Sequence, residues 1–170
     1  MIDDKDSSRM SGPFNWTKRH RATGRMIDIT TEQGRWALTT EHNGYQRQHG
    51  VRHERRLERS ASRSFVVEDR LRGRDSSLPA AVRYLIHPEF KVQRRGVSWT
   101  VDTNDDCTVL KITPSEPCRS CVLRGSDTPR GGWYSPQFGT KVPASQLILA
   151  STFSPSKWFG VTLEILPGQE

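Results

Sequence analysis

The sequence predicts an all-β fold, an antiparallel β-sandwich, on the strength of two patterns. Short segments that alternate apolar and polar residues recur along the chain, and Gly, Pro, Asn and Ser stand between them. No segment shows an apolar repeat at the helical period. Apolar residues make up only 33% of the chain, and the mean hydropathy is −0.72. Such a chain builds a thin core by itself, which suggests a partner domain or missing sequence.

The clearest predicted element is a β-hairpin within residues 36–69. Gly44 and Gly50 bracket a polar bend before its first strand. Residues 51–58 then alternate in the way expected of a strand with one face inward and one outward. A polar turn at residues 60–64 leads into the return strand, which is apolar at its start and acidic at its end.

The other elements follow from shorter patterns. Pro88 ends one strand because it lacks an N–H donor. Residues 114–132 are rich in Pro, Ser, Gly and charge and predict a long loop. We divide the chain into a polar N-terminal segment, residues 1–12, and a sandwich domain, residues 13–170. One or two short strands are predicted between residues 14–16 and 27–29, and Gly34 interrupts the chain before residues 36–38. Besides the hairpin, further strands are predicted at 80–87, 97–101, 107–112, 147–150 and 161–165.

Arginine dominates the charge of this chain. The formal net charge is +7, and 20 of the 26 basic residues are arginines, nine of them between Arg47 and Arg74. Arginine pairs bidentately with carboxylate, sulfate or phosphate, so acidic polysaccharide and nucleic acid are both candidate partners. Alternatively, these arginines pair with glutamates across the strands of the hairpin. Aromatic residues do not interleave with the basic cluster, which makes nucleic acid the less favoured partner.

Neither a membrane segment nor a metal site is expected. The chain has no apolar run of membrane-spanning length, and its acidic, polar start is not a secretory signal. The cysteine count is three, which is odd and argues against a disulfide framework. Cys118 and Cys121 have the spacing of a zinc-binding pair, but no second pair follows. We therefore interpret them as loop cysteines, with a metal as the less favoured alternative.

Four groups of residues, in order along the chain, form a recognisable pattern. The most distinctive group lies in the hairpin region and comprises Trp36, His42-x-Gly44-Tyr45, Gly50-Val51-x-His53-x-Arg55 and Val67-x-Asp69. The others are Asp6-Ser7-Ser8 with Gly12-Pro13-Phe14-x-Trp16, then Leu85-Ile86-His87-Pro88, and finally Gly132-Trp133-Tyr134-Ser135-Pro136-x-Phe138-Gly139. Together these groups resemble the heparinase II/III-like polysaccharide lyases, and the hairpin group resembles the C-terminal β-sandwich of that family.

The resemblance implies β-elimination on polysaccharides that contain uronic acid, such as glycosaminoglycans. It also implies that Tyr, His and Asn side chains, largely from an N-terminal α-helical toroid, do the chemistry. The resemblance further implies a structural zinc in the sandwich, bound by His and Asp. The motifs that carry these groups would lie before Met1. We therefore expect no catalytic residue, metal ligand or cofactor in this chain, which resembles the incomplete, trailing part of a periplasmic or secreted lyase without its toroid.

A few residues are candidates for binding an acidic polysaccharide. A phenol and an imidazole at the Gly-containing bend can reach one ligand, arginines can pair with carboxylate or sulfate, and an aromatic ring can stack on a sugar. Each has a structural alternative, because loop side chains often only cap turns and aromatic pairs often only close a sandwich edge. The candidates are His42, Tyr45, Arg47, His53, Arg55 and Trp133.

Three functions remain open from the sequence. The first is the C-terminal domain of a lyase that cleaves acidic polysaccharide. The second is a basic β-domain that binds polyanions, nucleic acid or glycan, without catalysis. The third is a folded remnant with no activity of its own.

Overall fold

The computed structural model describes residues 1–8, 10–12, 15–16, 22–30, 34–73 and 77–167. The chain divides into two compact units. The first comprises Met1–Ala80 and Ser151–Val161, and the second comprises Ala81–Ala150 and Thr162–Glu170. The predicted basic run Lys18–Arg21 lies outside the described residues.

Strands make up most of both units, which confirms the predicted all-β, antiparallel fold. In the first unit they are β1 (Met10–Gly12), β2 (Asn15–Trp16), β3 (Ala22–Thr30), β4 (Arg35–His42), β5 (Arg52–Ala61) and β6 (Ser64–Arg72). In the second they are β8 (Lys91–Arg95), β9 (Ser98–Asp102), β10 (Thr108–Pro114), β11 (Arg119–Arg124), β12 (Ser126–Asp127), β13 (Arg130–Gly131), β14 (Trp133–Tyr134) and β15 (Val142–Pro143). β7 (Leu78–Leu85), β16 (Ser145–Phe153) and β17 (Phe159–Ile165) have residues in both units.

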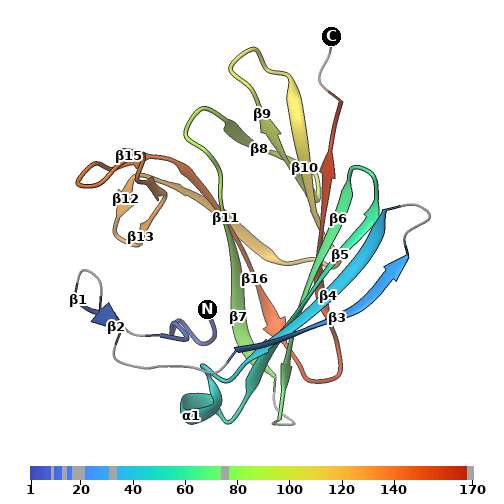
Figure 1. The fold of residues 1–170 in the computed structure, drawn as a ribbon. Helices are drawn as coiled ribbons and strands as arrows, with labels where there is room; N and C mark the ends of the chain where they lie inside the picture. The colour runs from blue at the N-terminus through green and yellow to red at the C-terminus, as the bar shows by residue number, and fades with distance from the viewer. Residues whose placement is uncertain (9, 13–14, 17–21, 31–33, 74–76, 168–170) are drawn as a thin grey trace. The chain divides into compact units, whose positions relative to one another are not determined.

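The first unit is built on four neighbouring antiparallel strands. β3, β4, β5 and β6 pair in chain order, and Figure 1 shows them side by side, coloured from blue to green. The predicted hairpin is β5 and β6, and its polar turn lies near Ser62 as expected. At that turn the Ser60 hydroxyl donates to the Ser64 hydroxyl, 3.0 Å away. The hairpin prediction is therefore confirmed, with both strands longer than the pattern indicated.

The polar bend before β5 contains a helix that the sequence prediction missed. α1 (Gln46–His49) is a single turn between Tyr45 and Gly50. Four residues are too few to display a helical repeat, so no periodicity could reveal it. The absence of a helical period therefore did not exclude this single turn. No helix in the described part of the chain is long and apolar enough to cross a membrane.

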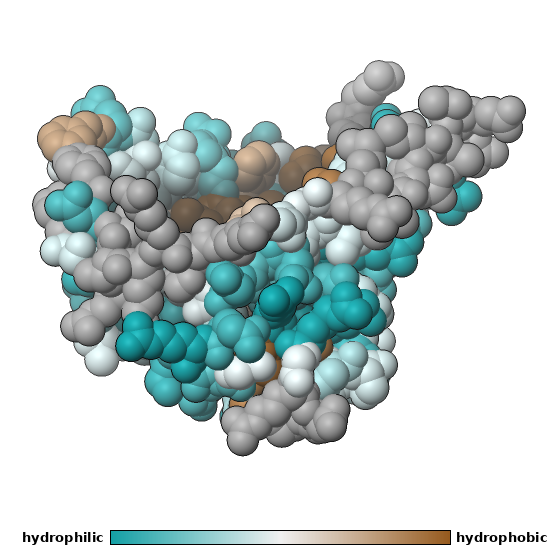
Figure 2. Space-filling model, turned by 60° about the horizontal axis from the view of Figure 1, so that its bottom comes forward, coloured by the Kyte–Doolittle hydropathy of each residue, from teal (hydrophilic) through white to brown (hydrophobic). Residues whose placement is uncertain are grey.

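Each unit has its own buried apolar residues. The first buries Val51, Leu71 and Val161 almost completely, and Phe153 stacks on Phe159 with ring centroids 5.2 Å apart. The second buries side chains of β7, β9, β10 and β16, together with Ala144 just before β16. These are Val82, Trp99, Val101, Ile112, Ala144, Leu147 and Leu149. The face of the molecule in Figure 2 is coloured mainly as hydrophilic, in keeping with the low apolar content.

The predicted long loop over residues 114–132 is wrong, because this segment contains β11. Every residue of β11 pairs with β16, from Arg119 opposite Ala150 to Arg124 opposite Ser145. The strand is polar and charged at several positions, so its own residues gave no strand pattern. It forms because the long, apolar β16 offers a complete ladder of hydrogen-bond partners.

Gly132 lies where several segments of the second unit meet. Its carbonyl oxygen accepts hydrogen bonds from the Gly125 and Ala144 amides, each 2.8 Å away. Its φ is +73°. A Cβ at this position would lie 2.5 Å from the Leu123 carbonyl oxygen and 2.7 Å from the Ala144 carbonyl oxygen. The local backbone therefore requires glycine for two independent reasons, left-handed conformation and lack of space.

Candidate functional site

The candidate residues at the start of the hairpin are positioned by the turn around α1. β4 ends at His42, Tyr45 precedes the helix, and Gly50 ends it in the left-handed conformation. The His49 and Gly50 amides then donate to the Tyr45 and Gln46 carbonyl oxygens. This one helical turn reverses the chain, so that His42 and His53 become direct cross-strand partners.

Strand register brings four polar side chains together, and we call them the histidine cluster: His42, His53, Arg55 and Asp69. His53 pairs with His42 on one side, and Arg55 pairs with Asp69 on the other. His53 Nδ1 lies 3.0 Å from His42 Nε2, and His53 Nε2 lies 2.7 Å from Asp69 Oδ1. Arg55 donates to both carboxylate oxygens of Asp69, at 2.8 and 3.0 Å.

The hydrogen-bond pattern assigns the proton on each imidazole. The Gly44 amide donates to His42 Nδ1 at 3.1 Å, so that nitrogen is an acceptor and His42 carries its proton on Nε2. His42 Nε2 then donates to His53 Nδ1, and His53 Nε2 donates to Asp69. All four ring nitrogens are therefore engaged, and neither histidine has a ring nitrogen left for a metal or a substrate proton.

Asp69 anchors the histidine cluster. Its side chain is only 1% exposed. Burial by itself would raise the pKa of this carboxyl, but the hydrogen bonds from His53 and Arg55 and the nearby charges outweigh it. The pKa of Asp69 consequently lies below its usual range. The carboxylate is thus held ionised, and it fixes both His53 and the exposed guanidinium of Arg55.

Tyr45 is buried beside the histidine cluster. Its ring centroid lies 5.6 Å from that of His42, and only 5% of the residue is exposed. Burial, followed by the charge of Asp6, raises the pKa of the phenol, although hydrogen bonds with Ser7 oppose the shift. A neutral, buried phenol is a poor general base at neutral pH.

Most arginines of the hairpin have carboxylate partners, as the alternative of cross-strand pairing foresaw. On the face opposite the histidine cluster, Arg70 Nε lies 2.5 Å from Glu54 and Arg52 lies 2.9 Å from Glu41. Glu54 is buried, and the Arg70 guanidinium also lies over the Trp158 ring, 4.2 Å from its centroid. These contacts give the arginines a role in holding the sheet.

Arg47 differs from the other arginines of this region. It is exposed on α1, and the described part of the chain gives its guanidinium no carboxylate partner. It is also close in sequence to Tyr45 and the histidine cluster. Arg47 therefore remains the most accessible of the candidate residues for an anionic ligand.

Trp133 lies in the second unit, apart in the chain from the other candidates. Its indole N–H donates to the Ser126 carbonyl oxygen at 3.1 Å. The Lys141 ammonium lies 3.9 Å from its ring centroid. One face of the indole thus already carries a cation, and a sugar would have to use the other face.

No metal site is formed among the described residues. The three cysteines are unpaired, with Cys107 and Cys118 half-buried and Cys121 exposed. No group of three or more His, Cys, Asp or Glu side chains in the described ranges is placed to hold a metal ion.

Sequence reasoning missed the partner role of Asp69. Asp69 belongs to the hairpin motif, but its residue type and spacing do not mark it as the group that binds His53 and Arg55. The turn alone does not place residue 69 opposite residue 55, because the register shifts by one residue between Arg59 and Ala61.

Comparison with known proteins identifies the family. The model of the family "Heparinase II/III-like, C-terminal" matches residues 1–157. The comparison with curated proteins gave no match.

Solved lyase structures share the fold. The heparan sulfate lyase HepC from Pedobacter heparinus aligns with a TM-score of 0.64 at 14% identity, over 86% of this chain and 22% of that one. The heparinase III BT4657 gene product aligns with a TM-score of 0.59 at 14% identity, over 85% and 21%. A further heparinase III aligns with a TM-score of 0.60 at 12% identity, also over 85% and 21%. The chain spans about a fifth of the length of these enzymes and, by its family match, belongs to the heparinase II/III-like C-terminal family.

Proposed function

We propose that this chain is the C-terminal β-sandwich domain of a lyase that cleaves uronic acid-containing polysaccharide by β-elimination. The observation that carries the proposal is the family match over residues 1–157. The fold shared with a heparan sulfate lyase supports it. An enzyme acting on such polymers meets them in the periplasm or outside the cell, so we propose that location too.

The chemistry requires groups that the histidine cluster and Tyr45 do not supply. β-Elimination needs a base for the proton beside the carboxylate, stabilisation of the charge that develops, and an acid for the leaving oxygen. In the histidine cluster every ring nitrogen is already engaged, and Tyr45 is buried with a raised pKa. We therefore propose that the base and the acid belong to an N-terminal α-helical toroid of the same enzyme.

The role that remains for this domain is to bind and orient the acidic chain. Arg47 and Arg55 are the proposed contacts for carboxylate or sulfate, because both are exposed. Arg55 is held in place by its two hydrogen bonds to Asp69. His42, Tyr45 and His53 then serve by fixing the turn, and Trp133 is the proposed sugar contact of the second unit.

The proposal is tested with the gene product as the genome encodes it, alongside the 170-residue chain. Both are incubated with heparan sulfate, with an unsulfated uronic acid polymer and with a neutral glucan. We expect the gene product to release unsaturated ends, seen as ultraviolet absorbance, from the acidic polymers only. We expect the 170-residue chain to bind acidic polymers without cleaving them. Absence of both cleavage and binding would overturn the proposal.

The alternative is a basic β-domain that binds polyanions without catalysis. The net charge of +7 favours it. The pairing of Arg52, Arg55 and Arg70 with carboxylates speaks against this alternative. An arginine paired with a carboxylate contributes less to the positive electrostatic potential that would attract a polyanion. Salt-sensitive retardation of DNA or RNA, with no uronic acid polymer bound or cleaved, would decide for this alternative.

A further inference from the structure

The second unit contains a pocket that none of the candidate residues belongs to. It has a volume of about 310 Å³ and is formed by β8, β9 and the segment between β10 and β11. Its apolar lining comes from Val97, Trp99, Pro114 and Pro117. A concave, mostly apolar surface with a few polar groups is the usual form of a small-molecule site.

Arg94 supplies the positive charge of this pocket. It is the cross-strand partner of Trp99, so both side chains stand on the same face of the sheet. Arg94 Nε donates to the Gly96 carbonyl oxygen at 3.1 Å. Within the described residues its two terminal nitrogens have no hydrogen bond or ion pair, so they can pair with a carboxylate or a sulfate.

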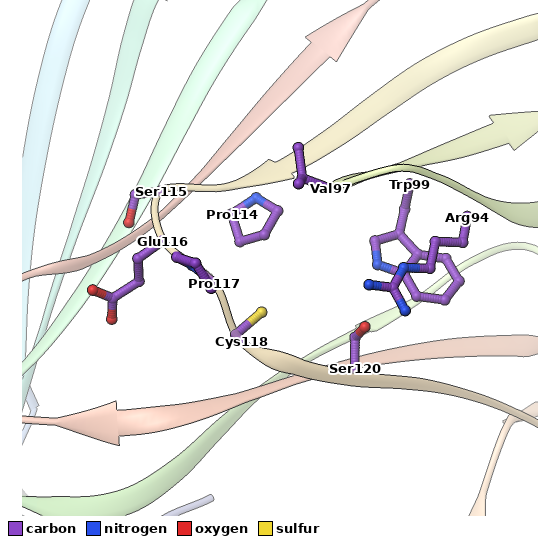
Figure 3. Close-up of a pocket in the computed structure, with 9 residues that line it drawn as sticks. All are labelled: Arg94, Val97, Trp99, Pro114, Ser115, Glu116, Pro117, Cys118 and Ser120. Atoms are coloured by element: carbon purple, nitrogen blue, oxygen red, sulfur yellow. The ribbon is translucent and has the colours of Figure 1, made fainter.

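The polar groups lie at opposite ends of the pocket. Figure 3 shows Arg94 beside Trp99 at one end, and Ser115 and Glu116 at the other, with the Glu116 carboxylate directed away from Arg94. The Cys118 thiol points into the space between them. An anionic group is therefore favoured at the Arg94 end, and polar groups without negative charge at the far end, beside Ser115 and Glu116.

We propose that this pocket binds one acidic sugar residue of the polysaccharide, with its carboxylate or sulfate on Arg94 and its ring against Trp99 and the two prolines. A purely apolar ligand would leave the Arg94 fork unused, and a small inorganic anion would leave the apolar lining hydrated. A sugar acid has both the charge and a C–H face that packs on apolar surface. The choice of a sugar rests on the proposed function, whereas the pairing of an anion with an apolar body rests on the pocket alone.

Cys118 allows binding to be located in the full 170-residue chain. It lines the pocket, whereas Cys121 is exposed and does not line it. Burial, and then the charge of Glu116, raises the pKa of the Cys118 thiol, while Arg94 opposes the shift. Alkylation with iodoacetamide is therefore run at mildly alkaline pH, where the thiolate forms. Mass spectrometry of the peptides that contain Cys118 and Cys121 gives the alkylation rate of each thiol separately.

The probe is a heparan sulfate tetrasaccharide, and a neutral glucan tetrasaccharide is its control. We expect the acidic probe to slow the alkylation of Cys118 but not of Cys121, and the neutral probe to slow neither. We expect Arg94→Gln to weaken binding about tenfold to a hundredfold, since it removes hydrogen bonds to a charged group. Arg95→Gln is the matched control, because Arg95 is also exposed on β8 but does not line the pocket. Thermal melting checks that both variants fold.

The outcomes separate this inference from the proposed function. If the tetrasaccharide binds the Arg94→Gln variant as tightly as the original chain, or leaves Cys118 unprotected, the pocket is not the site and the inference is overturned. Binding elsewhere, or cleavage by the gene product, would still support the proposed function in that case. Equal protection of Cys118 by a DNA oligonucleotide would overturn the assignment of a sugar.

Discussion

Replacing Asp69 with alanine is expected to destabilise the protein far more than any change at its exposed neighbours. The Asp69 carboxylate is 1% exposed and accepts three hydrogen bonds, one from His53 and two from Arg55. Its removal leaves the His53 N–H and the Arg55 fork without their acceptor. Breaking a buried charged pair in this way costs about 3–5 kcal/mol.

The expected cost is reduced because one partner reaches water. The Arg55 side chain is 45% exposed, so solvent replaces part of what it loses, whereas His53 is only 16% exposed. We therefore expect the Asp69→Ala variant to lose about 2–4 kcal/mol of unfolding free energy. Asp69→Asn keeps the shape of the side chain and one acceptor oxygen for His53. We expect it to lose about half as much unfolding free energy, because part of the hydrogen bonding is kept.

The assay is urea unfolding of the 170-residue chain, followed by tryptophan fluorescence and far-ultraviolet circular dichroism. Glu68→Ala is the matched control. Glu68 is the adjacent residue on β6, faces the other side of the sheet, and lies 3.7 Å from Arg56. Both side chains of this long pair are partly open to solvent, and such a pair contributes about 0.5 kcal/mol or less.

The pH dependence gives a second, independent check. Because the pKa of Asp69 is lowered in the folded protein, its contribution is fully present above the unfolded value, near 3.9. It is lost as the pH falls through the folded pKa. The difference in stability between the original chain and Asp69→Ala should therefore stay constant down to about pH 5 and shrink below about pH 4. A loss no larger than that of Glu68→Ala, or a difference unchanged by acid, would refute the reasoning.

Three further predictions concern the turn before β5. His42→Ala removes the acceptor of the Gly44 amide, so we expect about 1–3 kcal/mol of destabilisation and faster hydrogen exchange of that amide; unchanged exchange would contradict the turn-capping role. Gly44→Ala would place a Cβ 2.7 Å from the Ser7 Cβ and should cost about 1–3 kcal/mol in the urea unfolding assay. Gly24→Ala is its control, because the added Cβ meets its nearest atom at 3.5 Å and should leave the stability unchanged. Arg47→Gln should weaken heparan sulfate binding about twofold to fivefold at low salt and less at high salt, measured by titration calorimetry; a salt-independent loss would point to misfolding instead.

The sequence patterns predicted strands where each strand carried its own signal. The apolar runs in β16 and β17 are of this kind, because several side chains of each strand are buried. The alternation in β5 also predicted a strand, although burial does not alternate along it: Glu54 is buried and Arg55 is exposed. β11 and α1 were missed for two different physical reasons. β11 depends on the pairing partner β16, and α1 depends on a local reversal too short to have a period.

The residue types of the candidate site could be predicted, but their arrangement could not. His42, His53 and Arg55 were identified from their position in the hairpin motif. That His42 and His53 would bond to each other depends on the register across the α1 turn, which only the folded backbone defines. The pocket beside Arg94 had no sequence signal at all, since Trp99 is an ordinary core residue by its pattern and the segment from 114 to 118 resembled a loop.

The backbone junction at Gly132 has a consequence for engineering. The Gly125 and Ala144 amides both donate to the Gly132 carbonyl oxygen, so the tip between β14 and β15, residues 135–141, is held at its base by the main chain. Within the tip, the Ser135 hydroxyl is bonded to the Gln137 and Thr140 carbonyl oxygens. Extra residues or a foreign recognition sequence inserted at that tip should leave the edge formed by β11 and β16 undisturbed. Position 132 itself should accept no replacement, so a saturation library there would return a single surviving residue.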